Sequence, residues 1–232
     1  DGYGVLDYCV AGVYFIVYDW DDNVSASDVE SGDLEWSEEV GSSSCYEVEI
    51  IGASPDGETV YMLDDSISNE SMKDTGAKIL AVDVESGDIE VIETLKGKHV
   101  VTATMNDNSI CVAEFTNLDK NGDIFLYNIE DDDLTYYQAD YEINATSAEK
   151  MYLSPDSRYM LACLTSNSFS TVLLYDFQED EYEYIAENAN GILCYAWKED
   201  SSAYACGITG LIFVRSTDGD DILTIDTNGK NP

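Results

Sequence analysis

Basic residues are scarce in this sequence. Ten Lys and Arg stand against 48 Asp and Glu among 232 residues, which gives a formal net charge of −38. Binding to nucleic acid or to an anionic membrane surface depends on Lys and Arg that neutralise phosphates. We therefore expect neither partner, and expect instead a protein or small ligand, of basic character if the acidity is used for binding. The plainer interpretation of the acidity is solubility through a self-repelling surface.

Long apolar runs and a leader segment are also missing. The longest apolar run, residues 10–18, has nine residues, which is too short to span a membrane. The sequence begins at Asp1 with no initiator Met and no signal peptide, as expected of a processed or excised piece. We expect an extracytoplasmic, secreted or cell-surface protein, with the cytoplasm of a halophile as the alternative.

Metal-binding and catalytic motifs are absent from the sequence. The six Cys show no CxxC spacing and His99 is the single His, so a Cys/His zinc site has no support. Buried thiols are expected, with one or two disulfides as the alternative. No phosphate-binding loop, Gly-x-Ser-x-Gly motif or Ser/His/Asp set is present.

A short acidic turn, in contrast, is present five times. Its clearest forms are Asp28-Val-Glu-Ser-Gly-Asp-Leu and Asp83-Val-Glu-Ser-Gly-Asp-Ile, and looser copies begin at Asn128, Asp176 and Ser216. The first residues are 55, 45, 48 and 40 positions apart. This period is typical of solenoids, propellers and arrays.

Each copy of the turn occupies the same place in a larger unit. An apolar run such as 79–82 precedes it, and a more alternating run such as 89–93 follows it. Further upstream lies another apolar run, 60–63, introduced by the tight-turn sequence Ser54-Pro-Asp-Gly57. The unit therefore predicts four strands, a to d, with tight turns after a and c.

Four-stranded units repeated in this way are typical of β-propeller blades. The continuous apolarity of strands b and c predicts that both of their faces are buried, and helix should be scarce. A pair of β-sandwich modules is the alternative, but it does not explain the recurrence of the same two turns. We predict an all-β fold, a single β-propeller domain over 1–232 with about five four-stranded blades, either a closed five-bladed ring or part of a larger ring. The predicted blades span about 3–40, 46–94, 99–138, 148–187 and 191–226.

The two turn motifs also carry a family resemblance. Ser-Pro-Asp-Gly before strand b and Asp-x-x-Ser-Gly-Asp between c and d resemble the repeats of WD40-like, TolB-like and YVTN-type propellers. The resemblance covers essentially the whole chain and implies the fold class. The Trp-Asp pair of WD40 repeats is replaced at the end of strand c, for example by Val82-Asp83 and Tyr127-Asn128.

The connections between strands b and c vary most in length. Repeat proteins place such insertions on a functional face, and in propellers the b–c and d–a connections share one face. The binding-face candidates come from two of these connections and are Asp19, Trp20, Asp21, Asp22, Asp64 and Asp65. Solvated loops without a ligand are the alternative.

Two further groups of acids suggest chemistry. Asp119, Asn121 and Asp123, with Glu130 at position twelve, offer oxygen ligands in the manner of a calcium loop, and Ca²⁺ is the one cofactor that the sequence suggests. The Gly required at position six is Ile124, so a plain hairpin turn is the alternative. Glycosidase chemistry would need a carboxylate pair among the acids on or beside the innermost strands, Asp7, Glu47 and Glu49.

We therefore expect a non-catalytic propeller that mediates protein or ligand interaction through its variable b–c and d–a face. A glycosidase-like propeller hydrolase that uses inward-facing carboxylates is one alternative, and a structural acidic surface protein is another. No catalytic residue is assigned.

Overall fold

The chain forms β-strands joined by turns. The computed structural model describes residues 5–40, 48–64, 76–96, 102–115, 121–140, 147–165, 170–189, 192–208 and 210–226. No helix occurs in these ranges, and hence none that is long and apolar enough to cross a membrane. The chain divides into two compact units, residues 1–101 (unit 1) and 102–232 (unit 2).

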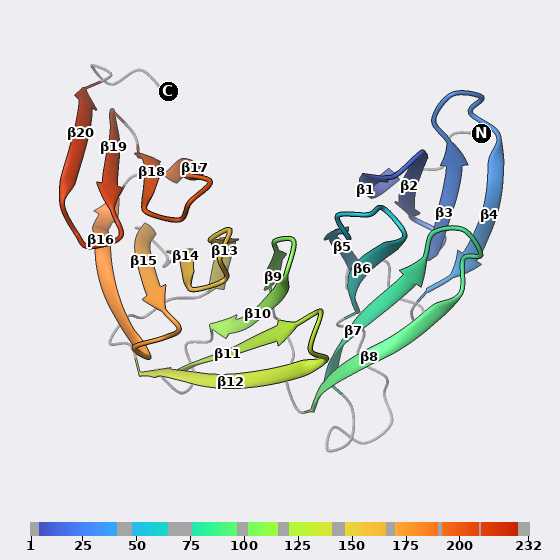
Figure 1. Cartoon of the computed structure of the whole chain (residues 1–232), viewed down its shortest axis with the longest axis horizontal. Helices are drawn as coiled ribbons and strands as arrows, with labels where there is room; N and C mark the ends of the chain where they lie inside the picture. Colours follow the sequence, from blue (N-terminus) through green and yellow to red (C-terminus); the bar gives the residue numbers. More distant parts are fainter. Residues whose placement is uncertain are drawn as a thin grey trace. The chain divides into compact units, whose positions relative to one another are not determined.

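Unit 1 contains two antiparallel four-stranded sheets, each with its strands in chain order (Figure 1). The strands of the first are β1 (Val5–Ala11), β2 (Tyr14–Asp19), β3 (Asn23–Asp28) and β4 (Leu34–Glu39). Those of the second are β5 (Val48–Ala53), β6 (Thr59–Asp64), β7 (Gly76–Asp83) and β8 (Ile89–Lys96).

Unit 2 contains three further sheets with the same strand order. Their first strands are β9 (Thr102–Met105), β13 (Ser147–Leu153) and β17 (Ile192–Trp197), and their second strands are β10 (Ser109–Phe115), β14 (Tyr159–Thr165) and β18 (Ala203–Ile208). The third strands are β11 (Asn121–Asn128), β15 (Ser170–Asp176) and β19 (Leu211–Ser216), and the fourth are β12 (Asp133–Asp140), β16 (Glu181–Ala189) and β20 (Asp221–Asp226). The predicted fold class, all-β with five four-stranded propeller blades, is confirmed.

The repeated acidic turn is the c–d turn of every sheet. The side chain of its first residue accepts backbone N–H groups from within the turn, as when Asp83 Oδ1 accepts from Glu85 at 3.1 Å and Ser86 at 2.7 Å. Each copy contains a residue in the left-handed conformation, at the fifth position in four copies and at the fourth in the last: Gly32, Gly87, Asp132, Asp180 and Gly219. These local bonds explain why the motif recurs, because they fix the turn geometry without help from other strands.

One backbone hydrogen bond joins the two turns of each sheet. The residue after the first position of the c–d turn donates its N–H to the last residue of the a–b turn. The five donor–acceptor pairs are Val29–Val13, Val84–Glu58, Ile129–Asn108, Phe177–Arg158 and Thr217–Ser202. This bond defines equivalent positions from sheet to sheet, independently of any sequence alignment.

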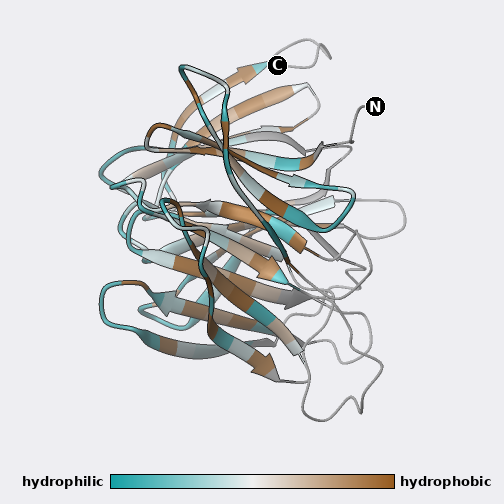
Figure 2. Ribbon diagram, turned by 90° about the vertical axis from the view of Figure 1, so that its right-hand side faces the viewer, coloured by the Kyte–Doolittle hydropathy of each residue, from teal (hydrophilic) through white to brown (hydrophobic). Residues whose placement is uncertain are grey.

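The core of unit 1 lies between its two sheets. Ile16, Tyr18 and Ala26 of the first sheet pack with Met62 and Leu80 of the second. Brown hydrophobic segments run along the strands in Figure 2, whereas the turns are largely teal. Apolar burial therefore holds the faces of adjacent sheets together.

The prediction that strand b is buried on both faces is confirmed for β6 and wrong for β2. All residues of β6 after Thr59 are buried. In β2, Ile16 and Tyr18 are buried but Phe15 is 38% exposed. The second sheet of unit 1 covers only the face of β2 that carries Ile16 and Tyr18, and this explains the difference.

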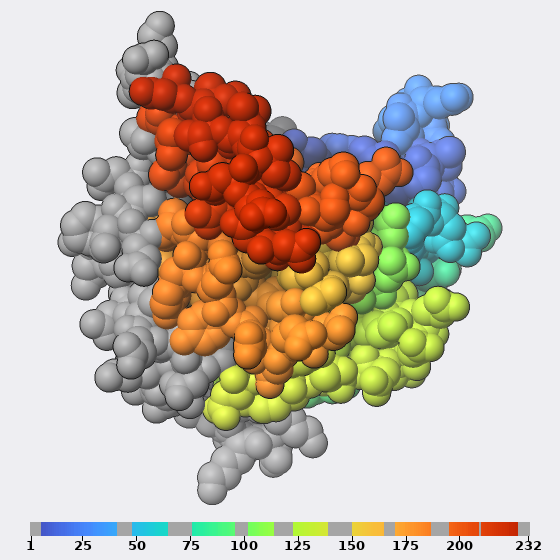
Figure 3. Space-filling view, turned by 60° about the vertical axis from the view of Figure 1, so that its left-hand side comes forward, coloured from blue at the N-terminus to red at the C-terminus, as the bar shows by residue number. Residues whose placement is uncertain are grey.

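Unit 2 has two interfaces of the same kind. Cys111 and Ile124 pack with Met160 and Leu173 between its first and second sheets. Leu161 and Leu174 pack with residues such as Tyr204 between its second and third sheets. The adjoining orange and red surfaces in Figure 3 belong to this second pair of sheets.

Candidate functional site

The predicted binding loop of unit 1 is tightly hydrogen-bonded. Asp19 Oδ1 accepts the backbone N–H groups of Asp21 at 2.9 Å and Asn23 at 3.1 Å. The Tyr18 hydroxyl donates to Asp22 Oδ1 at 2.9 Å, and Asp22 has a left-handed φ of 60°. Asp19 and Asp22 thus shape the β2–β3 loop, whereas Trp20, which is 41% exposed, and Asp21 lie on its surface.

The second predicted binding-face group begins at the end of β6. The Asp64 side chain is buried, and its Oδ2 lies 3.7 Å from Nζ of Lys78 on β7. Asp65 lies outside the described residues. Asp64 is therefore committed to an ion pair beside the b–c connection of its sheet, and a role of Asp65 in binding stays a prediction.

The calcium prediction falls partly outside the described residues, because Asp119 does. Asn121 begins β11, and the carboxylate of Asp123 accepts a hydrogen bond from the Tyr136 hydroxyl. Glu130 follows the far end of β11, so the extended strand keeps its side chain away from Asp123. Within the described ranges no group of three or more His, Cys, Asp or Glu is placed to hold a metal ion.

Asp7, which was predicted to lie on the innermost strand of the first sheet, accepts hydrogen bonds from the backbone. Asp7 Oδ2 accepts the backbone N–H of Ile50 on β5 at 2.9 Å, and its Oδ1 accepts the N–H of Tyr8 at 2.8 Å. Asp7 therefore links the inner strands of the two sheets in unit 1. Glu47 lies outside the described residues, and Glu49 is on β5.

Two cysteines of the described regions, Cys9 and Cys111, are not activated as thiolates. Burial raises the pKa of Cys9 to about 11, with a further contribution from the Asp7 charge. Burial also raises the pKa of Cys111, which is an unbridged thiol. A raised pKa keeps a thiol protonated at neutral pH, so neither residue is suited to nucleophilic catalysis.

Unit 1 has a cleft at the end of the sheets that carries the tight turns. The cleft has a volume of about 380 Å³, within the range of about 300–1,000 Å³ common for ligand sites. Its side chains come from both sheets and are Val13, Tyr14, Glu58, Asp83, Val84 and Glu85. It is therefore an acidic cleft with an aromatic and aliphatic component, which we call the unit 1 cleft.

The walls of the unit 1 cleft are fixed by close contacts. A Cβ atom on Gly57 would lie 2.4 Å from the backbone nitrogen of Gly12, so the two a–b turns meet through glycine backbone. On the other side, Trp36 Nε1 donates to the carbonyl oxygen of Val84 at 2.8 Å. Gly87 lies against the same indole, where a Cβ would be 2.8 Å from Trp36 Cδ2. These contacts form the cleft before any ligand arrives.

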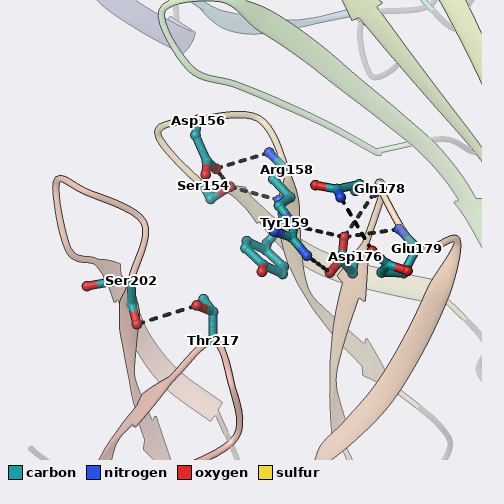
Figure 4. Close-up of polar contacts among 9 residues, drawn as sticks. All are labelled: Ser154, Asp156, Arg158, Tyr159, Asp176, Gln178, Glu179, Ser202 and Thr217. Atoms are coloured by element: carbon teal, nitrogen blue, oxygen red, sulfur yellow. Dashed lines mark hydrogen bonds and ion pairs between the residues drawn. The ribbon is translucent and has the colours of Figure 1, made fainter.

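Unit 2 has a smaller cleft, of about 160 Å³, which is lined mainly by β14, β15 and β16 of its second sheet and by Thr217 of its third sheet. Its polar residues are Tyr159, Asp176, Glu179, Glu181, Tyr182, Glu183 and Thr217. Figure 4 shows Arg158 reaching Asp176 beside this unit 2 cleft, with Nη2–Oδ2 at 2.7 Å and Nε–Oδ1 at 3.2 Å. The Arg158 guanidinium carbon also lies 4.8 Å from the centre of the Tyr159 ring.

The pKa shifts of Asp176 and Arg158 agree with this ion pair. Although burial raises the pKa of Asp176, the hydrogen bonds from Arg158 and from two backbone N–H groups outweigh it and lower the pKa overall. The same carboxylate raises the pKa of Arg158. The unit 2 cleft therefore has an internal cation beside its tyrosine and its acids.

The comparisons with known proteins agree with the fold. No family model and no curated protein matches the chain. Among solved structures it is similar to hydrazine synthase of Kuenenia stuttgartiensis, with a TM-score of 0.62 and 14% sequence identity over 91% of this chain and 64% of that chain. At this identity the likeness supports the propeller fold and carries no residue roles. Since 1142 chains match in structure, the fold itself selects no activity.

No motif in the sequence predicts the two clefts. Tyr14 and Glu58 stood out in no motif, because each follows an ordinary turn. The available signal was a comparison of one repeat position, which holds Val13, Glu58, Asn108, Arg158 and Ser202 in the five sheets. The change from Glu58 to Arg158 at equivalent positions of a recurring turn indicates that the two side chains have different surroundings.

Proposed function

We propose that this chain is a non-catalytic binding module that engages a protein through the face carrying its b–c connections. The observation that supports the proposal most directly is the β2–β3 loop. Trp20 is 41% exposed beside Asp21 on a loop closed by its own hydrogen bonds. A loop that is already ordered loses little conformational entropy on binding, and Trp is enriched among residues that dominate interface energies.

Charge favours a basic partner. With a net charge of −38, the surface attracts cations and accelerates encounter with positively charged proteins. An exposed indole next to a carboxylate suits a Lys or Arg side chain, because the ring face and the carboxylate both attract the cation. The variable face thus supplies a rigid aromatic anchor with an acidic neighbour.

The proposal is tested by selecting basic peptides from a displayed library against the immobilised chain and measuring affinity by biolayer interferometry. Trp20→Ala should weaken the selected peptides at least tenfold, in line with an aromatic hot spot. Tyr8→Ala is the matched control, since Tyr8 is 63% exposed in the same sheet but lies outside the loop. Equal losses in the two variants, or no selection of basic peptides, would reject the proposal.

A further inference from the structure

The first sheet of unit 1 has an exposed apolar face. The strand register places Tyr8 and Val10 of β1 on this face together with Phe15 and Val17 of β2. Tyr8 is 63% exposed and Val10 is 60% exposed, and the ring centres of Tyr8 and Phe15 lie 5.6 Å apart. On β3 and β4 the register continues the face with Ser25, Ser27 and Ser37. We call these residues the first outer face.

The equivalent face is buried in other sheets. Phe15 lies two residues beyond the carbonyl that accepts the hydrogen bond between the a–b and c–d turns. The residues at this position in three other sheets are Val60, Met160 and Tyr204. They are 1% exposed or less, and each belongs to a core shared with the preceding sheet. The first outer face is therefore the half of an inter-sheet interface that receives a preceding sheet.

The last sheet of unit 2 exposes the other half of such an interface. Its register places Ile212 and Val214 of β19 on one face with Leu223 and Ile225 of β20, which we call the last outer face. Leu223 is 50% exposed and Ile225 is 45% exposed.

The repeat also gives the equivalents of this last outer face. Ile212 lies five residues before the N–H that donates the hydrogen bond between the turns. The residues at this position in three other sheets are Val24, Ile124 and Val172. They are fully buried, and each belongs to a core shared with the following sheet. The last outer face is thus the half that receives a following sheet.

Neither outer face has a charged side chain at the positions named above. On β17 and β18 the register extends the last outer face with Ala196, Ala205 and Gly207. A sheet face that stays in water usually carries polar residues in alternation with the buried ones, and this chain has 48 Asp and Glu to supply them. Two copies can therefore meet at these faces without bringing carboxylates together, although a net charge of −38 repels them elsewhere.

We propose that the first outer face binds the last outer face of a second copy of this chain. The described inter-sheet cores each join one face of either kind, and a single chain exposes one of each. Burial of aliphatic and aromatic side chains drives the association, as it does between the sheets within each unit. The contact joins two unlike faces, so it is heterologous and builds rings or open chains of copies.

The test is sedimentation velocity of the full chain over a series of protein concentrations. A sheet face about 20 Å square is smaller than the roughly 800 Å² per partner of a standard stable interface. We therefore expect a reversible complex whose mean sedimentation coefficient rises with concentration. Added NaCl should strengthen it, because salt screens the repulsion between copies. A chain that stays monomeric at every concentration and salt level would overturn the proposal.

This association is separate from binding through the β2–β3 loop. Salt should weaken the binding of basic peptides to that loop, because their attraction to the acidic chain is screened. Trp20→Ala should leave self-association unchanged. Failure of this proposal and failure of the loop proposal can then be told apart.

Two variants each block one face. Val10→Glu with Phe15→Glu charges the first outer face, and Leu223→Glu with Ile225→Glu charges the last outer face. Each variant alone should associate at least about tenfold more weakly than wild type, because a carboxylate is costly to bury. An equimolar mixture should form a dimer and grow no further, because each variant contributes one intact face. Self-association of the last-face variant would show that like faces pair, and would overturn the proposal, as would a mixture that stays monomeric.

The matched control is Ile89→Glu with Val91→Glu. It adds the same two charges at exposed positions of β8, the fourth strand of the second sheet of unit 1, and should weaken association by less than about twofold. An equal loss in this control would show general repulsion between acidic chains and overturn the proposal. Val10→Ser with Phe15→Ser, which repeats the serines of the same face, replaces the first-face variant if thermal unfolding shows that the glutamates prevent folding.

Discussion

The clefts of units 1 and 2 share two equivalent positions, Tyr14 with Tyr159 and Val84 with Thr217, but their other walls differ. Unit 2 places Arg158 over Tyr159 and against Asp176, and its cleft is small. Unit 1 has Val13 in the corresponding position, and its cleft is more than twice as large. Both clefts are acidic, but the acids of the unit 1 cleft come from turns of its second sheet, whereas those of the unit 2 cleft come from β15, β16 and the turn between them. One repeat position thus holds an arginine beside the unit 2 cleft and a neutral side chain in the unit 1 cleft, without a change of fold.

The largest expected effect comes from the glycine contact that shapes the unit 1 cleft. Gly57→Ala places a methyl group 2.4 Å from the backbone nitrogen of Gly12 at a φ of +75°. We expect a loss of about 3 kcal/mol in the free energy of unfolding, because both strain and collision act. Gly32→Ala is the control, since Gly32 has a similar φ of +74° with nothing within 4 Å, and should lose about 1 kcal/mol. Urea unfolding measures both, and equal losses would show that the contact contributes nothing.

Removal of Arg158 should leave Asp176 of the unit 2 cleft without its cation. Arg158→Ala loses two hydrogen bonds to Asp176 and the contact with the Tyr159 ring. The Arg158 side chain is 37% exposed, so solvent screening limits the loss to about 1 kcal/mol. Methylguanidinium should restore part of that stability by binding the folded state. Lys198→Ala, which removes a pair with both side chains 58% exposed, should change stability less than Arg158→Ala does and show no such recovery.

The pH dependence of the Asp176 pair has a definite sign. Because the folded-state pKa of Asp176 is lowered, its charge stabilises the fold above the ordinary pKa near 4 and loses that effect as the pH falls through the lowered value. Asp176→Asn retains a side-chain acceptor for the turn, as Asn128 does in another sheet. Wild type should therefore exceed this variant in stability at pH 7, and the gap should close below about pH 4. Urea unfolding at pH values between roughly 2.5 and 7 measures this gap across the titration of the carboxyl group, and a constant gap would contradict the assignment.

The smallest expected effect concerns the left-handed residue of the c–d turn. This residue is Gly in both c–d turns of unit 1 and Asp in two of the three c–d turns of unit 2. The hydroxyl of Tyr127, directly before the turn, donates to Asp132 Oδ1 at 2.7 Å. Asp132→Gly loses this bond but relieves the left-handed strain, so stability should change by less than about 0.5 kcal/mol. Tyr127→Phe loses the bond without that relief and should destabilise by about 1 kcal/mol. Thermal unfolding that ranked the two variants in the opposite order would reject this account of the turn.

Local chemistry made much of the fold predictable. Ser54-Pro-Asp-Gly57 and the Asp83 turn contain their own hydrogen-bond acceptors and left-handed residues, so short segments of sequence specify them. The strands between them follow from apolar runs of the right length. The pairing of Tyr127 and Tyr175 with Asp132 and Asp180 was also visible in principle, because each tyrosine precedes a turn that lacks glycine.

The candidate sites were less accessible from sequence because they depend on contacts between sheets. The hydrogen bond from Trp36 to Val84 joins residues 48 positions apart, and the meeting of Gly12 and Gly57 is equally remote in the chain. The Asp19–Asp22 segment was identified as a site, but its composition did not indicate which acids close the loop and which face solvent. Only the hydrogen bonds of Asp19 and Asp22 separate these roles.

The bond between the a–b and c–d turns has a consequence for how such a chain can change over time. Since Val84 N donates to Glu58 O inside a single sheet, each sheet fixes its own strand alignment. Residues 65–75 can lengthen or shorten at the other end of β6 and β7 without shifting the Glu58–Glu85 end. One end of each repeat is then free to diversify while the other preserves the framework. Substitutions and insertions at one end of a sheet therefore need not disturb the other end.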